Sequence, residues 1–134
     1  MKILGTVESD RFEHRIVQPH FINPCGFGED LADWLREQLR GLSTLGFEID
    51  APVQEDYGWG FWMRKGKSKL WLALSYVGEG PTETPARWVL SITHSGIMAS
   101  LFGRVDSDSI HTIEEAINAA IATSDDIKWV EEAC

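Results

Sequence analysis

The chain has 134 residues, of which 43% are hydrophobic and 25% are charged, and its formal net charge is −9. This composition is typical of one globular domain over residues 1–134 and excludes a chain that is disordered throughout. A chain this acidic repels phosphate backbones, and none of its apolar runs approaches the roughly 20 residues of a membrane helix. We therefore expect no nucleic-acid partner and no membrane partner.

The two cysteines, Cys25 and Cys134, stand far apart and show no Cys-x-x-Cys spacing. Lone thiols of this kind suit a reducing compartment better than a disulfide-stabilised secreted fold. The first ten residues contain too short an apolar run for a signal peptide. We expect a cytoplasmic protein.

The first elements in chain order are a strand, a loop and a long helix. Alternating apolar residues predict the strand over residues 12–17. Leucines at spacings of three and four predict the helix over residues 28–45, and Gly46 is the expected residue at its end.

The rest of the chain predicts further strands and a second helix. Alternation and turn residues predict strands at residues 47–50, 57–64, 69–76, 86–94 and 127–130. The second helix is predicted to begin at Ile110 or Ile113 and to end at Thr123, after a short helical turn within residues 96–102. We therefore expect an α+β fold of two layers, in which a mostly antiparallel sheet of five or six strands has two helices packed on one face.

The charges are unevenly distributed along the chain. Residues 29–56 hold eight acids against two arginines, and residues 105–134 hold eight acids against one lysine. Residues 57–75 hold four basic residues and no acid. The sequence therefore predicts two acidic regions and one basic hairpin tip, and solubility alone is one explanation of the acids.

The most informative segment is an aromatic run, Tyr57–Trp62, which is predicted to pair with Lys69–Leu74 as one β-hairpin. If Gly66 and Lys67 form a two-residue turn, Trp62 lies opposite Trp71. A turn one residue earlier would change the partners but leave each side chain on the same face of the sheet.

Strand alternation divides the aromatic residues between two faces. Those predicted to lie in the core are Trp34, Tyr57, Trp59, Phe61 and Trp88. Trp62 and Trp71 fall on the opposite face, beside glycine and alanine and next to Arg64 and Lys69 at the tip, which is the composition of a contact patch. The residues of the next strand predicted to extend this patch are Val89, Ser91 and Thr93. The alternative is that the two indoles pack against each other, or under the loop at residues 77–86.

Two acidic residues, Glu55 and Asp56, directly precede the aromatic run. Carboxylates beside aromatic rings hold a cation through charge and ring quadrupole together, so these residues are candidates for a ligand pocket. Solvated turn residues are the alternative interpretation.

Signatures of catalysis are sparse. The four histidines show no metal-binding spacing, so we predict no metal site and no cofactor. His94 at the end of a predicted strand and Cys25 near His20 are the candidates for a hydrolase-like site, but the sequence identifies no partner group for either. We assign no catalytic residue.

Three segments within about the first 75 residues carry a resemblance: Asn23-Pro24, Phe27–Leu31 and Glu55–Trp59. In these segments the chain resembles small uncharacterised bacterial single-domain proteins. The resemblance implies a bacterial cytoplasmic origin, and it implies no activity and no site.

Together these features predict a non-enzymatic protein-binding module that contacts a protein partner, or a second copy of itself, through Trp62 and Trp71. The acidic regions would steer a basic partner, as in inhibitor or immunity proteins. One alternative is a small-ligand-binding protein whose pocket combines aromatic residues with Glu55 and Asp56. The other is a hydrolase-like enzyme that uses His94 or Cys25.

Overall fold

The computed structural model describes residues 1–23, 26–78, 84–94 and 103–130. Its elements in chain order are β1 (Lys2–Ser9), α1 (Glu29–Gln38), the 3-10 helix η1 (Arg40–Leu45), β2 (Glu48–Ile49), β3 (Val53–Glu55), β4 (Gly58–Lys65), β5 (Ser68–Tyr76), β6 (Ala86–His94), α3 (Gly103–Ala122) and β7 (Ile127–Trp129).

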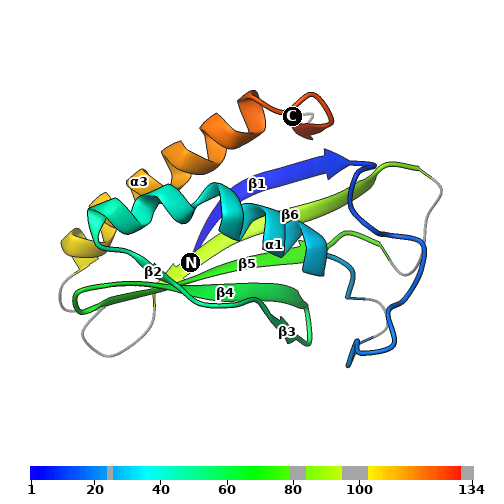
Figure 1. The fold of residues 1–134 in the computed structure, drawn as a ribbon, viewed down its shortest axis with the longest axis horizontal. Helices are drawn as coiled ribbons and strands as arrows, with labels where there is room; N and C mark the ends of the chain where they lie inside the picture. The colour runs from blue at the N-terminus through cyan, green and yellow to red at the C-terminus, as the bar shows by residue number, and fades with distance from the viewer. Residues whose placement is uncertain (24–25, 79–83, 95–102, 131–134) are drawn as a thin grey trace.

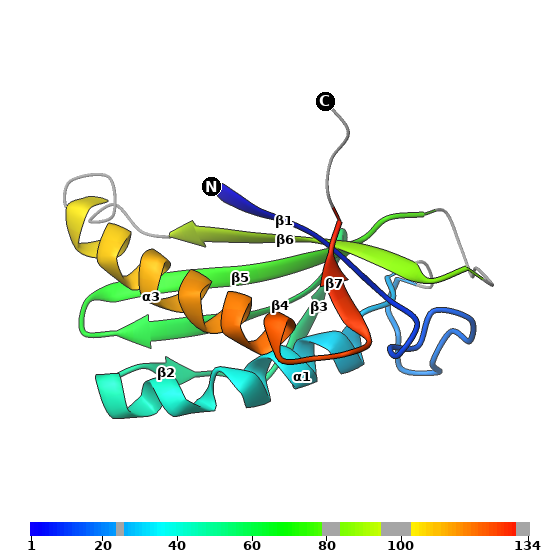
Figure 2. The ribbon, with the colours of Figure 1, turned by 90° about the horizontal axis from the view of Figure 1, so that it is seen from above.

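The strands form one curved antiparallel sheet in the order β2-β4-β5-β6-β1-β7, with β3 beside β2 on the same edge of β4 (Figure 1). The described residues contribute seven strands, at least one more than expected. The prediction of a mixed α and β fold with an antiparallel sheet is confirmed. Figure 2 shows the long central strands β5 and β6 side by side, with β1 crossing beside β6.

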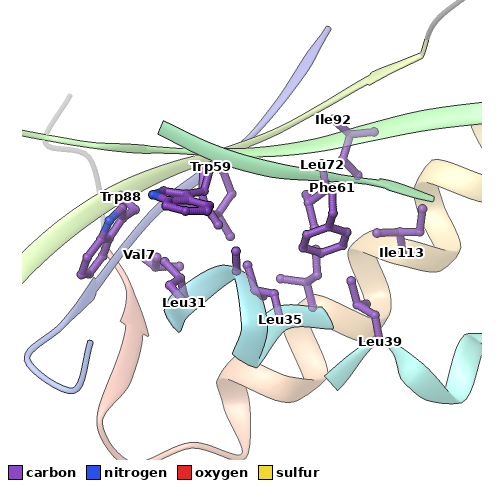
Figure 3. Close-up of a cluster of buried hydrophobic side chains, with 14 of the residues drawn as sticks. Val7, Leu31, Leu35, Leu39, Trp59, Phe61, Leu72, Trp88, Ile92 and Ile113 are labelled. Carbon is purple, nitrogen blue, oxygen red and sulfur yellow. The ribbon is translucent and has the colours of Figure 1, made fainter. Parts of the chain in front are cut away.

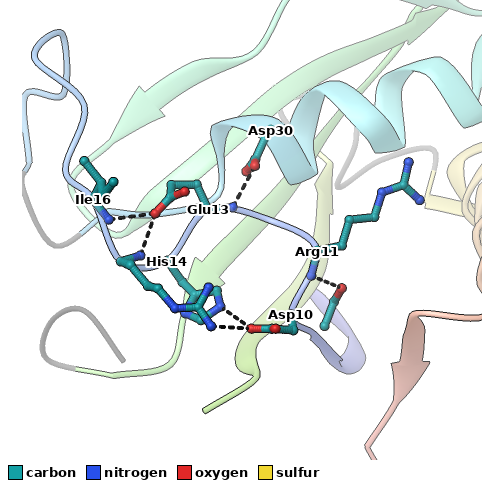
Figure 4. Close-up of polar contacts among 8 residues, drawn as sticks. Asp10, Arg11, Glu13, His14, Ile16 and Asp30 are labelled. Atoms are coloured by element: carbon teal, nitrogen blue, oxygen red, sulfur yellow. Dashed lines mark hydrogen bonds and ion pairs between the residues drawn. The ribbon is translucent and has the colours of Figure 1, made fainter. Parts of the chain in front are cut away.

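The predicted strand over residues 12–17 is wrong, and the first strand is β1. Residues 12–17 belong to a loop in which side chains bind the backbone (Figure 4). The Glu13 carboxylate accepts hydrogen bonds from the backbone N–H groups of Arg15 and Ile16, at 2.9 and 2.7 Å. These local bonds replace a strand ladder, so the apolar alternation reflects a folded loop.

The long helix predicted over residues 28–45 begins at Glu29 but changes to a 3-10 helix after Leu39. Gly41 lies in the second part, where its low helix propensity weakens the α-helical turn. Gly46, with φ of 93°, ends the segment as expected. The second helix, α3, begins at Gly103, earlier than predicted, and the turn predicted within residues 96–102 lies outside the described residues.

The core combines one side of α1 and α3 with alternate side chains of the strands (Figure 3). Leu31 and Leu35 of α1 and Ile113 of α3 are buried in the same cluster as Phe61 of β4. Its labelled members in Figure 3 are Val7, Leu31, Leu35, Leu39, Trp59, Phe61, Leu72, Trp88, Ile92 and Ile113.

Three tryptophans predicted to be core residues lie in or against this cluster. Trp59 and Trp88 are buried, and their indole N–H groups donate to the backbone oxygens of Gly26 and Phe27, at 2.6 and 3.0 Å. Trp34 is half-buried and packs against the cluster. The two buried indoles therefore attach the loop before α1 to the sheet.

The predicted hairpin register is confirmed for β4 and β5, in which Trp62 pairs with Trp71. The strands are joined by Gly66 and Lys67, since Lys65 pairs with Ser68. Gly66 has φ of 58°, and among the described residues no residue other than glycine has a positive φ. A positive φ at the first turn residue alone is the signature of the predicted type II′ turn.

The polar loop predicts a pH-dependent contribution to stability. The two backbone N–H groups bound to Glu13 hold the pKa of its carboxyl below the ordinary value of 4.5. A carboxyl whose pKa is lower in the folded chain stabilises the fold above the ordinary value and loses this effect as the pH falls. We expect wild type to have a higher urea midpoint than Glu13→Gln at pH 7, and the difference to shrink as the pH falls below 4.5. A difference independent of pH would contradict this assignment.

Candidate functional site

Trp62 of β4 and Trp71 of β5 form a cross-strand pair on the face opposite the buried side chains. Their ring centroids lie 4.9 Å apart with an interplanar angle of 60°. Lys69 Nζ lies 4.2 Å from the Trp62 ring centroid, which is a cation–π contact. Both indoles are half-buried. The pair is therefore ordered by its own contacts while part of each ring stays exposed.

The position of the Trp71 ring depends on the absence of a side chain at Gly60. A Cβ atom built on Gly60 would lie 2.4 Å from Trp71 Cζ2, so the indole occupies the space above the Gly60 backbone. The alternative in which Trp62 and Trp71 pack against each other is thus partly realised. The other alternative is that the loop at residues 77–86 covers the two indoles. Residues 79–83 of that loop lie outside the described residues.

Tyr57 was predicted to lie in the core, and this prediction is wrong. Its side chain is 49% exposed, and its hydroxyl oxygen accepts a hydrogen bond of 2.5 Å from Trp71 Nε1. The reason is that Tyr57 lies with Asp56 in the two-residue turn between β3 and β4, since Glu55 pairs with Gly58, so strand alternation does not extend to Tyr57. Tyr57 therefore joins Trp62, Lys69 and Trp71, and we call these four residues the aromatic face.

The aromatic face keeps free hydrogen-bonding capacity. Among the described residues, Trp62 Nε1 has no hydrogen-bond partner. This nitrogen is not buried, so its N–H group is exposed to solvent. Burial raises the pKa of Tyr57, so its hydroxyl keeps its proton at neutral pH and remains able to donate. The surface therefore combines apolar ring area with two donors.

Small and apolar residues continue the aromatic face across the sheet. Strand pairing places Val53, Gly60, Ala73, Ser91 and Ile3 in one row over five strands. The residues at the two ends of this row are exposed, Val53 to 48% and Ile3 to 61%. Val89, Ser91 and Thr93 of β6, predicted to extend the patch, lie on this side and are half-buried.

The charged residues predicted for the site lie at the two ends of the aromatic face. At the hairpin tip, Arg64 Nη2 contacts Asp50 Oδ1 at 2.7 Å and Glu48 Oε2 at 3.3 Å. At the other end, Glu55 is exposed and pairs with Gly58 through the backbone, which directs it to the same side as Trp62.

Asp56 lies next to Glu55 in an exposed turn, and its backbone oxygen accepts a hydrogen bond of 2.6 Å from Asn23 Nδ2. Within the described residues, no three His, Cys, Asp or Glu side chains come together as metal ligands would. The pocket predicted at Glu55 and Asp56, which combines two carboxylates with aromatic rings, stays a prediction.

Sequence reasoning placed Lys69 at the tip of this surface but missed Tyr57, Val53 and Ile3 as members of it. The available signal for Tyr57 was its position between Asp56 and Gly58, because aspartate and glycine favour turns. No comparable signal exists for Ile3, whose strand joins the surface only through pairing with β6.

The hydrolase alternative gains no support from the described residues. Within them, His94 has no hydrogen-bond or ion-pair partner, and Cys25 lies outside them. His20, the suggested neighbour of Cys25, binds Glu29 at 2.8 Å and faces the Trp59 ring at a centroid distance of 6.4 Å.

His14 is fully buried and binds Asp10 Oδ1 at 2.8 Å, beside Arg15 on the same oxygen (Figure 4). This group lies in the loop before α1 and away from the aromatic face. It stabilises the loop, since Asp10 carries the charge that satisfies both donors.

Comparison with protein-family models, with curated proteins and with solved structures finds no match for this chain. None of the described helices combines the length and apolar character that crossing a bilayer requires. The site must therefore be interpreted from its own geometry.

Proposed function

We propose that this protein is a non-enzymatic protein-binding module and that its aromatic face binds a second copy of the same chain. The half-buried Trp62–Trp71 pair carries this proposal, because rings of this size are rarely left open unless a partner covers them. Exposed Val53, Tyr57 and Ile3 extend the apolar area around the pair.

The proposal includes a two-layer fold with both helices on one face of the sheet. In its support, buried residues of α1 and α3 share one cluster with Phe61 and Leu72. Both helices also lie along the same side of the ribbon in Figures 1 and 2. A sheet with one uncovered face gains free energy when a second sheet packs on it at a spacing of about 10 Å.

The charges at the two ends of the aromatic face favour a second copy of the chain as the partner that covers it. Lys69 lies at the hairpin end of the aromatic face and Glu55 at the opposite end, roughly 20 Å away along β4. A two-fold axis midway between the two packed sheets, parallel to them and perpendicular to β4, would bring the Lys69 end of each copy to the Glu55 end of the other. The most common closed assemblies use a self-complementary surface of this kind.

The acids of α1 support the same arrangement. Glu29, Asp33 and Glu37 lie on the helix, and the buried side of that helix faces the core side of the sheet. Two chains of net charge −9 therefore meet without bringing these acids together. The acids would also steer a basic protein, which is the competing occupant.

We further propose that the module works in the cytoplasm of a bacterium, without nucleic-acid or membrane partners. The lone cysteines and the acidic charge support this setting. A thiol titration of protein purified from its own host tests the compartment, and two free thiols per chain are the expected result.

The test of self-association is native mass spectrometry and light scattering over a concentration series. Wild type is expected to be dimeric, and the double variant Trp62→Ser, Trp71→Ser monomeric, with a melting temperature only a few degrees lower. Trp34→Ser is the matched control, because it removes another half-buried indole but lies on α1. This control should remain dimeric.

A charge exchange tests the orientation of the two copies. Lys69→Glu and Glu55→Lys should each weaken the dimer, and the two together should restore it at unchanged net charge. A wild-type monomer at the highest soluble concentration would overturn the proposal. Loss of the dimer in Trp34→Ser would overturn the assignment to the aromatic face.

A further inference from the structure

A cavity of about 350 Å³ lies between α1 and β2, and the aromatic face does not contribute to it. Its lining residues are Asp33, Arg36, Glu37, Arg40, Ser43, Phe47, Glu48 and Ile49. The three residues from α1, Asp33, Arg36 and Glu37, follow helical spacing, so they share one side of the helix, and Arg40 is the first residue of η1. The volume is within the range of about 300–1,000 Å³ in which small-molecule sites fall.

Most charges around this cavity already have partners. Arg40 Nη2 lies 3.1 Å from Glu37 Oε2, and Arg64 Nη2 lies 3.3 Å from Glu48 Oε2. Arg64 Nη2 also lies 2.7 Å from Asp50 Oδ1, so Glu37 and Glu48 each have a cationic partner, and Glu48 shares its partner. The charges that remain are Arg36 and Asp33, one helical turn apart.

Arg36 is half-buried and incompletely satisfied. Its Nη2 donates to the backbone oxygen of Ile49 at 3.2 Å, while its Nε is buried without a hydrogen-bond partner. Among the described residues, no carboxylate lies within ion-pair distance of the Arg36 guanidinium. A half-buried cation with no carboxylate in direct contact is unfavourable, and a bound carboxylate would reduce that cost.

Asp33 supplies the opposite charge on the same side of α1. Asp33 is exposed, but partial desolvation of its carboxyl raises the pKa, Glu29 adds to this effect and Arg36 opposes it. An ammonium group beside Asp33 would relieve the repulsion from Glu29. The cavity therefore offers one site for a carboxylate and one for an ammonium.

We propose that this cavity binds a zwitterionic α-amino acid with an apolar side chain. Arg36 holds the carboxylate of the amino acid, Asp33 holds its ammonium, and Phe47 and Ile49 contact its side chain. A phosphate or a dicarboxylate does not fit, because Asp33 repels a second negative charge. This site is separate from the proposed dimer surface.

A titration followed by ¹H–¹⁵N NMR tests the proposal on the intact chain. L-Leucine, L-valine and L-phenylalanine are added separately, and the Arg36 Nε–H and Ile49 backbone N–H signals are followed. We expect at least one of the three to shift both signals saturably. 4-Methylpentanoate, which lacks the ammonium, and 3-methylbutylamine, which lacks the carboxylate, should bind at least tenfold more weakly than L-leucine.

Variants separate the two charge contacts. Arg36→Gln and Asp33→Asn should each weaken binding at least tenfold. The affinity of wild type should also fall as the pH falls through the pKa of Asp33, because protonation removes the charge that holds the ammonium. Arg87→Gln, an exposed change on β6, should bind like wild type. The same spectra report folding, and Asp33→Asn decides the outcome if Arg36→Gln does not fold.

Three results would overturn the proposal. The first is the absence of a saturable shift with all three amino acids. The second is equal affinity for 4-methylpentanoate, which would make the site a simple anion site. The third is undiminished binding in the folded Arg36→Gln or Asp33→Asn variant. None of these results bears on the dimer, which is measured without any added ligand.

Discussion

Replacing Trp88 with alanine is expected to lower the free energy of unfolding by about 3–5 kcal/mol, the usual cost of deleting a large buried aromatic side chain. Trp88 is fully buried in β6, and its ring contacts Phe12 and Tyr76 at centroid distances of 6.0 and 5.9 Å. Its indole N–H donates to the Phe27 oxygen at 3.0 Å. Because a domain of this kind is stable by only about 5–15 kcal/mol, the variant is expected to be barely folded.

The measurement is urea unfolding followed by circular dichroism, with Trp88→Phe as the comparison. The phenylalanine variant keeps ring area but leaves the Phe27 oxygen without its donor, so a loss of about 1–3 kcal/mol is expected. Trp88→Ala removes both the ring and the hydrogen bond, whereas Trp88→Phe removes mainly the hydrogen bond. Equal losses of stability in the two variants would therefore show that ring packing contributes little, contrary to this expectation. A loss below 1 kcal/mol in Trp88→Ala would contradict the placement of this ring in the core.

Replacing Gly58 with alanine is expected to be equally severe, with a loss of about 4 kcal/mol when the cost of overpacking and the cost of backbone strain are added. A Cβ atom at this position would lie 2.1 Å from the backbone oxygen of Leu74, which cannot move without disturbing β5. The φ of Gly58, 153°, is also one that other residues rarely adopt.

Gly41→Ala is the matched control, because nothing lies within 4 Å of its added Cβ atom and its φ is not positive. Gly41→Ala is expected to leave the free energy of unfolding unchanged or to raise it by about 0.4–1 kcal/mol, because alanine lowers the conformational entropy of the unfolded chain. In any folded fraction of Gly58→Ala, the Trp71 Nε1–H signal should shift, since Tyr57 loses its position. A Gly58→Ala protein as stable as the control would contradict the close approach of β4 and β5.

The hairpin was predictable because its determinants are local. Alternation over β4 and β5 and a glycine suited to a type II′ turn specify which residues face each other, and Trp62 pairs with Trp71 as the sequence indicates. Trp59 and Trp88 are buried for the same reason. Strand alternation alone therefore separated the two core indoles from the pair on the other face.

Strand β1 was not predicted because its alternation is interrupted. The register with β6 shifts between Ile3 and Gly5, and a bulge of this kind displaces the period-two pattern by one residue. The loop after β1 was mistaken for a strand because Phe12 and His14 are buried by contacts distant in sequence, such as that of Phe12 with Trp34.

By itself, the sequence determined the two faces of the hairpin, the apolar side of α1 and the antiparallel sheet, since each depends on the periodicity of neighbouring residues. The structure then selected one of the two hairpin registers that the sequence allowed. Only the tertiary structure decided the position of Tyr57, the row that ends in Ile3, and the isolation of Arg36 beside a cavity. These features arise where segments distant in the chain meet. Their burial and charge pairing depend on packing that no local pattern encodes.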